Sequence, residues 1–162
     1  MEITVDYLKN YPHFVPEISE YFYQEWSYLC PERDLQGFED SIRSRLNVDR
    51  IPLALVAVGN SNFYGTVCLK QFDMDTRKEL SPWLAGLYVK EGFRNRGLGR
   101  LLAESITGLA GRMGIGELFL YTPNAESFYL RLGWSTAFHE QYHGTDVCIM
   151  KKSIERNFFS LS

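Results

Sequence analysis

The stretch between residues 94 and 100 carries the most distinctive chemistry of the chain. It reads Arg-Asn-Arg-Gly-Leu-Gly-Arg, so arginine and glycine occupy most of its positions. Glycine has no Cβ atom, so backbone amides in such a loop can approach a ligand closely, and arginine adds forked donors that suit phosphate. A helical pattern follows, and a helix N-terminus favours an anion. The stretch predicts a phosphate or pyrophosphate site, and the alternative is a glycine turn with solvated arginines.

Two other phosphate-binding motifs fit this stretch poorly. A P-loop requires GxxxxGK[ST], and no segment of the chain matches it. A dinucleotide-binding fold requires GxGxxG directly after a strand, but Leu102 stands at the third glycine position after Gly97 and Gly99. What remains is the pattern [Gln/Arg]-x-x-Gly-x-[Gly/Ala] between a strand and a long helix.

Cysteine and histidine offer little for a metal or redox centre. The three cysteines are far apart and form no CxxC pair. Cys68 and Cys148 fall in apolar, strand-like stretches, so we expect them to be small buried hydrophobic residues. His139 and His143 are four residues apart, but their segment reads as a strand, on which they would not share a helix face. We expect no metal site.

The elements that must position the glycine loop are readable around it. Residues 82–89 form an apolar, strand-like run in which Gly86 indicates a bulge or a close approach by a ligand. The polar loop 90–96 follows. Apolar residues from Leu98 to Met113 then recur at helical spacing, and 117–121 is a short strand. This strand–helix–strand unit predicts two parallel, neighbouring strands.

The rest of the chain supplies further short elements. In chain order they are a strand at 3–7, a helix with Pro16 in its first turn, a helix capped by Asp34, a hairpin of 51–58 with 63–72, a helix at 127–132, a hairpin of 134–142 with 147–152, and a tail at 154–162 that is a short helix or disordered. The order predicts an α/β fold with a mixed sheet and helices on its faces. We expect one domain over residues 1–162.

Composition narrows the classes of partner. The chain has 162 residues, of which 45% are hydrophobic, and its net charge is −3. A nucleic-acid binder is usually more basic, so we expect no nucleic-acid partner. No apolar run approaches the ~20 residues that span a bilayer, and the first ten residues lack an apolar signal core. These features predict a soluble, cytoplasmic protein without a membrane partner.

A second block supports a family resemblance. Residues 125–134 read Ala-Glu-Ser-Phe-Tyr-Leu-Arg-Leu-Gly-Trp, and the spacing from the glycine loop leaves room for one helix and one strand. Together with Arg94, Gly97 and Gly99, this block resembles the GCN5-related N-acetyltransferase (GNAT) superfamily. The resemblance covers residues 82–134 and is weak before residue 51.

The resemblance implies a fold and a reaction. The expected fold has a central, mostly antiparallel sheet with one splayed parallel strand pair and flanking helices. The expected cosubstrate is acetyl-CoA, whose acetyl group passes directly to a primary amine of a small molecule or peptide. The alternatives are a sensor module that binds acetyl-CoA without turnover and, more remotely, a different nucleotide-binding protein. The expected assembly is a monomer or a homodimer.

The resemblance also implies the residues that bind the cosubstrate. Backbone groups of Leu87 and Val89 would hold the acetyl and pantetheine parts, and the glycine loop would hold the pyrophosphate. Many members carry an asparagine at the position of Thr122, so Thr122 or Asn124 would have to substitute here. The full expected set is Leu87, Tyr88, Val89, Arg94, Asn95, Arg96, Gly97, Leu98, Gly99, Arg100, Thr122, Asn124 and Phe128.

Tyr129 matches the general acid of the family, which protonates the leaving thiolate. A phenol and a thiol have similar proton affinities, so the role is chemically sensible. An amide N–H near Leu87 would polarise the thioester carbonyl. The alternative for Tyr129 is a packed aromatic ring beside Phe128 and Trp134.

The general base and the acceptor pocket are less defined. Glu79, Asp75 and Glu25 are candidates for the base, and Glu79 is preferred because it lies just before the cofactor strand; the alternative for each is a solvated surface carboxylate. The acceptor side is expected to combine acids with aromatic residues, which suits a cationic amine. Its aromatic candidates are Tyr21, Trp26 and Trp83, and its acids include Glu25, Asp73 and Asp75. The alternative for Tyr21 is a core aromatic residue.

Overall fold

The computed structural model describes residues 2–156. In this range seven strands form one mixed sheet in the order β1-β2-β3-β4-β5-β7-β6. The strands are β1 (Thr4–Tyr7), β2 (Leu53–Gly59), β3 (Asn62–Lys70), β4 (Trp83–Val89), β5 (Glu117–Thr122), β6 (Ser135–Tyr142) and β7 (Thr145–Ser153). The helices are α1 (Val15–Trp26), α2 (Leu35–Arg43), α3 (Leu98–Arg112) and α4 (Glu126–Arg131), with short 3-10 turns at η1 (Leu8–Asn10), η2 (Pro12–Phe14) and η3 (Ser27–Leu29).

The predicted element order and the mixed α/β fold are confirmed. Every neighbouring pair of strands is antiparallel except β4 and β5, which are parallel as the strand–helix–strand unit predicted. The tail expected at 154–162 lies mostly outside the described residues.

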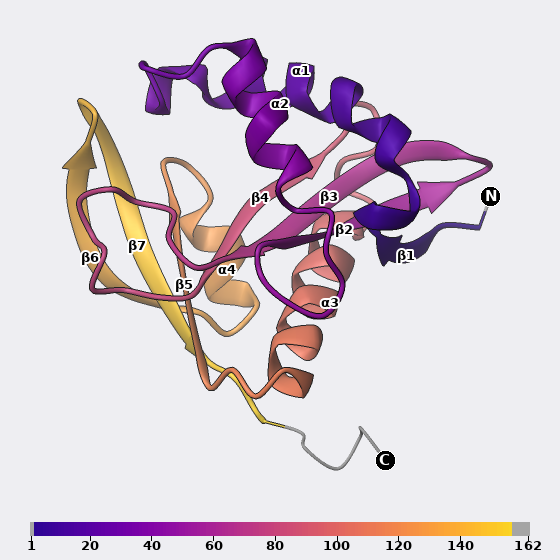
Figure 1. Ribbon diagram of the computed structural model, residues 1–162. Coiled ribbons are helices and arrows are strands. Elements are labelled where there is room, and N and C mark those ends of the chain that lie inside the picture. Colours follow the sequence, from indigo (N-terminus) through magenta and orange to yellow (C-terminus); the bar gives the residue numbers. More distant parts are fainter. Residues whose placement is uncertain (1, 157–162) are drawn as a thin grey trace.

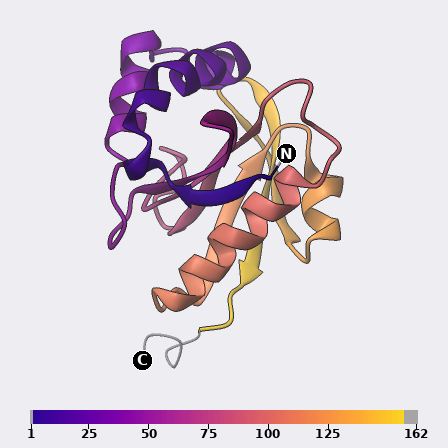
Figure 2. The same cartoon turned by 90° about the vertical axis from the view of Figure 1, so that its right-hand side faces the viewer.

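The helices cover both faces of the sheet. Figures 1 and 2 show α1 and α2 on one face and α3 on the opposite face. Leu55 of β2 packs in the core beneath α3, whereas its neighbour Val56 packs in the core beneath α1 and α2. A strand covered on both faces has no solvated side, which explains why residues 53–59 are all buried and read as a continuous apolar run.

Local signals set the helix starts. Pro16 lies in the first turn of α1, where its missing N–H costs nothing. The Asp34 carboxylate accepts a hydrogen bond from the amide of Gly37 at 2.8 Å and caps α2, a contact worth about 1 kcal/mol. Gly97 precedes α3 with φ +83°, a left-handed conformation that glycine adopts without strain.

The parallel pair β4–β5 is splayed. A single Cα pair, Trp83 with Phe119, joins the two strands. The register between β3 and β4 shifts at Gly86, whose φ is +61°, so the bulge predicted at this glycine is confirmed. A bulge bends its strand and increases the local twist, which turns the C-terminal half of β4 away from β5.

Burial bears out the expectation for two cysteines. Cys68 and Cys148 are buried free thiols.

Among the helices of residues 2–156, none combines the length and the apolar character that crossing a membrane requires.

Candidate active site

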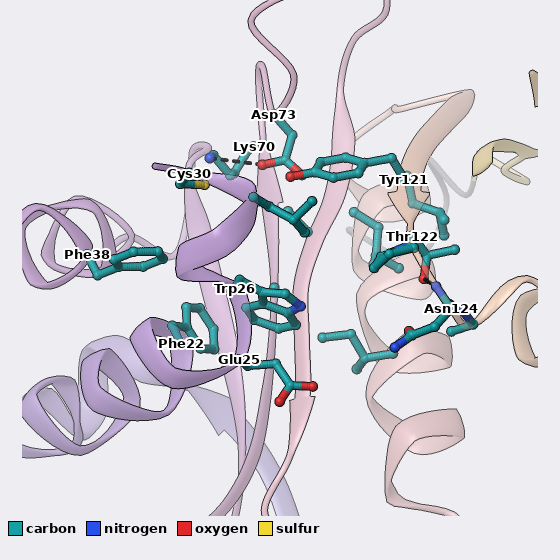
Figure 3. A pocket seen from close by; sticks show the side chains of 18 of the residues that line it. Phe22, Glu25, Trp26, Cys30, Phe38, Lys70, Asp73, Tyr121, Thr122 and Asn124 are labelled. Atoms are coloured by element: carbon teal, nitrogen blue, oxygen red, sulfur yellow. Dashed lines mark hydrogen bonds and ion pairs between the residues drawn. The ribbon is translucent and has the colours of Figure 1, made fainter. Parts of the chain in front are cut away.

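A cavity of about 190 Å³ occupies the split between β4 and β5. Figure 3 shows Glu25 and Trp26 of α1 on one side of it and Thr122 and Asn124, at the end of β5, on the other. Four parts of the chain contribute to its lining: the α1–η3 region and the segment after it, β4, the end of β5, and five more distant side chains. The lining residues are Phe22, Glu25, Trp26, Leu29, Cys30, Arg33, residues 84–87, residues 120–125, Phe38, Arg45, Lys70, Asp73 and Tyr129. The first N-terminal helices therefore meet the sheet at the point where the sheet opens.

The glycine loop leads from β4 into the N-terminus of α3. No described residue accepts a hydrogen bond from the backbone amides of residues 94–100. Unpaired amides at the start of a helix, together with its dipole, make a site for an anion. A Cβ atom built on Gly97 would meet nothing within 4 Å, so this glycine is required for its φ and not for lack of space.

Gly99 has a different role from Gly97. A Cβ atom at this position would lie 3.2 Å from the ring of Phe128 and 3.9 Å from Val89. The first turn of α3 thus packs closely against α4 and the end of β4. Phe128, expected from the family resemblance to bind the cosubstrate, supports the start of α3 in this way.

The three arginines of the loop have different partners. The Arg94 Nε donates to the carbonyl oxygen of Val89 at 2.8 Å. Arg100 pairs with Glu104 one turn along α3, at 2.8 Å between Nε and Oε1. The guanidinium of Arg96 lies over the ring of Phe93 in the same loop. All three are exposed, so their charges remain available to an anion at the free amides.

Tyr129 joins the packed core to the cavity. Its ring makes edge contacts with Phe128 and Trp134 at centroid distances of 5.0 and 6.0 Å, and the residue is 7% exposed. Its hydroxyl has no hydrogen-bond partner among residues 2–156, and the side chain lines the cavity. Burial raises the pKa of Tyr129 above its ordinary value, so the hydroxyl stays protonated and can donate a proton into the cavity.

Thr122 and Asn124, expected to substitute for the family's asparagine, both line the cavity but have different contacts. The Thr122 Oγ1 accepts a hydrogen bond from the amide of Ala125 at 3.0 Å, which closes the turn before α4. Asn124 also lines the cavity and keeps its side-chain amide available (Figure 3).

The structure separates the three carboxylates considered for the general base. Glu25 lines the cavity. Glu79 pairs with Arg77 at 3.3 Å, its side chain is 59% exposed, and it does not line the cavity. Asp75 pairs with His143 at 3.6 Å and borders a separate hollow. The geometry therefore favours Glu25. Glu25 was among the three candidates named from the sequence, where Glu79 was preferred.

The aromatic residues expected on the acceptor side behave differently. Trp26 lines the cavity. Trp83 does not, so that expectation was wrong: it is fully buried, its Nε1 donates to the carbonyl of Leu80 at 2.8 Å, and its ring packs near Phe119. Tyr21 stacks on Tyr88 at 5.2 Å, as the core alternative predicted, so the Tyr88 side chain faces α1.

Sequence reasoning missed one cluster of polar side chains and one buried arginine. Glu126, His139 and Cys148 meet because His139 and Cys148 lie opposite each other on β6 and β7. The Glu126 carboxylate accepts hydrogen bonds from Thr136 at 2.6 Å and from the thiol of Cys148 at 3.3 Å, which lower the pKa of Glu126. These contacts attach α4 to the β6–β7 hairpin. Sequence reasoning also missed a single residue, Arg45. It is buried and lines the cavity, although no pattern around it in the sequence indicated a functional role.

Comparison with known proteins gives a consistent result. Residues 12–134 match the Acetyltransferase (GNAT) family. A protein of Chlorobaculum tepidum described as an uncharacterized N-acetyltransferase is 36% identical over 59 residues, which cover 36% of this chain and 37% of that protein. The match thus spans little more than a third of the relative's length.

Solved structures share the fold at low sequence identity. An aminoglycoside 6'-N-acetyltransferase in complex with coenzyme A superposes with a TM-score of 0.74 at 15% identity, over 97% of this chain and 99% of that one. The PaiA N-acetyltransferase of Thermoplasma acidophilum, also with coenzyme A, superposes with a TM-score of 0.68 at 22% identity, over 94% and 99% of the two chains.

Proposed function

Because the chain belongs to the Acetyltransferase (GNAT) family, we propose that it binds acetyl-CoA in the split between β4 and β5 and transfers the acetyl group directly to a primary amine. One observation carries the proposal: the cavity at the split is lined by Tyr129, whose hydroxyl has no partner in the described chain, and it lies beside the strand that leads into the free amides of residues 94–100. An anion site and a proton donor thus flank one opening in the sheet.

The donor fits the open edge of β4. Since β4 pairs with β5 at one position only, the backbone groups of Leu87 and Val89 on that edge can bind an extended pantetheine chain as a neighbouring strand would. The amides of residues 94–100 then hold the pyrophosphate, with Arg94, Arg96 and Arg100 adding positive charge. Tyr88 contributes through its backbone, because its side chain faces α1. Asn124 and Thr122 line the cavity at the other side of the split.

The chemistry requires two proton movements. The amine nitrogen attacks the acetyl carbonyl, the new C–N bond forms, and the C–S bond breaks as coenzyme A leaves. An amide N–H near Leu87 stabilises the oxygen on which charge develops. The hydroxyl of Tyr129 gives its proton to the leaving sulfur, and a base accepts a proton from the amine.

Glu25 is the base that the geometry supports. It faces the cavity from α1, and no described residue forms an ion pair with it. The role of Glu79 as the base remains a prediction. Because Glu79 does not line the cavity, its position supports that role less than the position of Glu25 does.

The test is an acetyl-transfer assay. The protein is incubated with acetyl-CoA and a panel of primary amines, and release of free coenzyme A thiol is followed. Turnover with at least one amine, together with a rise in melting temperature on adding coenzyme A, is the expected result. Stabilisation by coenzyme A without turnover on any amine would favour the sensor alternative. Absence of stabilisation would contradict the proposal as a whole.

A further inference from the structure

Arg45 is a buried cation beside the cavity. It lies just beyond the last turn of α2, is 6% exposed, and lines the cavity next to β4. Its Nη1 lies 3.1 Å from the point that a Cβ atom on Gly86 would occupy. The guanidinium therefore reaches the β4 bulge from the opposite wall, at the residue before Leu87.

The partners of Arg45 do not neutralise its charge. Its Nη2 donates to the Ser41 hydroxyl at 3.3 Å, and its guanidinium carbon lies 5.8 Å from the centre of the Phe22 ring. Its Nε is buried without a hydrogen-bond partner, and no carboxylate of residues 2–156 lies within 4.0 Å of it. The C-terminal end of α2 is partly negative, but a helix dipole offsets only a fraction of a full charge. A buried charge without a counter-ion is costly, so this position calls for an anionic ligand.

Among the other charged residues of the cavity lining, Arg33 and Glu25 have no ion-pair partner in the described part of the chain. Lys70 and Asp73 pair with each other at 3.2 Å, and the side chain of each is 18% exposed (Figure 3). Arg33 is exposed and lies over the ring of Phe38. The cavity thus presents one unpaired carboxylate and one unpaired buried guanidinium.

We propose that the acceptor is an amino acid whose carboxylate binds Arg45 and whose amine faces Glu25. The inference rests on the acetyl transfer proposed above and names its acceptor class. Because Arg45 meets β4 at Gly86, beside the Leu87 backbone that would hold the acetyl carbonyl, the carboxylate lies close to the reacting atoms. A short spacing between amine and carboxylate, as in α-amino acids and β-alanine, fits this arrangement. Guanidinium and carboxylate then form the charge-assisted, forked hydrogen bonds that Arg45 lacks within the chain.

The test compares matched acceptors. The twenty standard α-amino acids and β-alanine are assayed with acetyl-CoA, each beside its carboxamide, which keeps the amine and loses the negative charge. The carboxamide amine is less basic, so the comparison works against the proposal. For the best acceptor, kcat/KM is expected to be about ten to a hundred times higher with the carboxylate than with the carboxamide.

Two variants locate the effect. Arg45→Met is expected to reduce that ratio to about one through a higher KM for the amino acid, while coenzyme A still raises the melting temperature. Removing an unpaired buried charge should not lower stability, so a folded variant is expected. Arg43→Met is the matched control: Arg43 lies two residues earlier on α2, pairs with Glu39 at 3.3 Å, and does not line the cavity, so the ratio should persist.

The outcomes separate the two proposals. Equal rates with amino acids and carboxamides, or a ratio that survives Arg45→Met, would overturn the amino-acid inference and leave acetyl transfer intact. A preference of the wild type for succinyl-CoA over acetyl-CoA that Arg45→Met abolishes would also overturn it, because the carboxylate would then belong to the acyl group. Failure of coenzyme A to stabilise the protein would reject acetyl transfer itself.

Discussion

The two sides of the proposed site present different kinds of groups to the proposed ligands. The donor wall, by which we mean β4 together with residues 94–100 beyond the cavity lining, offers backbone amides, a strand edge and glycine conformations. The acceptor wall, formed by α1, α2 and the segment after it, offers the side chains of Glu25, Trp26 and Arg45. Backbone recognition requires glycine at set spacings, which leaves a pattern in the sequence. Side-chain recognition depends on which residues the fold brings together, so it leaves no such pattern.

The largest expected effect concerns Tyr129, the one side chain that we propose acts on the donor, where the other donor contacts are made by the backbone. Tyr129→Phe should lower kcat about a hundredfold, because it removes the proton donor to the leaving thiolate. The hydroxyl makes no hydrogen bond within the described chain, so stability and coenzyme A binding should change little. Single-turnover thiol release measures the rate of the chemical step, and melting temperatures with and without coenzyme A measure binding and stability. Tyr23→Phe, at an exposed site on α1, is the control; equal rates for Tyr129→Phe and wild type would remove the acid role.

The next effect concerns the acceptor wall. Glu25→Gln should lower kcat at neutral pH by roughly tenfold to a hundredfold, because an alkyl ammonium must lose a proton before it attacks. The deficit should shrink as pH rises and the amine deprotonates without help. Glu79→Gln, outside the cavity, should remain within about twofold of wild type. The pH dependence of kcat for the two variants decides between these carboxylates, and a large loss in Glu79→Gln alone would reverse the assignment.

A smaller effect tests the donor wall through its backbone. Gly97 and Gly92 have φ of +83° and +90°, and a Cβ atom on either meets nothing within 4 Å. Alanine at either position should therefore cost a similar 1–2 kcal/mol of stability. Only Gly97→Ala disturbs the free amides, so it should weaken coenzyme A binding about five- to tenfold, as measured by calorimetry. Equal affinities in the two variants would show that the loop conformation does not set binding.

The smallest expected effect is the absence of an alkaline decline. Burial raises the pKa of Tyr129 above the ordinary value of ~10, so its hydroxyl stays protonated as pH approaches 10. The rate should then rise with pH as the acceptor amine deprotonates, and level off without falling up to about pH 10. A pH–rate profile with a stable amine acceptor tests this. A decline centred near pH 8 or 9 would mean that the proton donor is a more acidic group than Tyr129.

The donor wall was largely predictable. Gly97, Gly99 and the bulge at Gly86 each reflect a local backbone requirement, and local requirements are visible in neighbouring residues. Tyr129 was predictable because it lies within a block of fixed spacing. Its unpartnered hydroxyl was not, since that depends on which groups the other elements leave out of reach.

The acceptor wall was mostly not predictable. Trp83 looked suited to a pocket but is core, because β4 is covered at that point by β5 and the β6–β7 hairpin. Glu79 lies close to the cofactor strand in sequence, yet its carboxylate pairs with Arg77 and does not line the cavity. Arg45 carried no pattern, since an arginine after a helix usually lies in solvent.

The sequence by itself determined the element order, the parallel β4–β5 unit and the glycine loop at the start of α3, because helix and strand periodicity and glycine conformation are properties of short segments. Only the tertiary structure decided which side chains face the split in the sheet. Glu25 from α1, Arg45 from beyond α2 and Tyr129 from α4 meet there although they are far apart in the chain. That meeting depends on how helices pack across both faces of a twisted sheet, which no local pattern encodes.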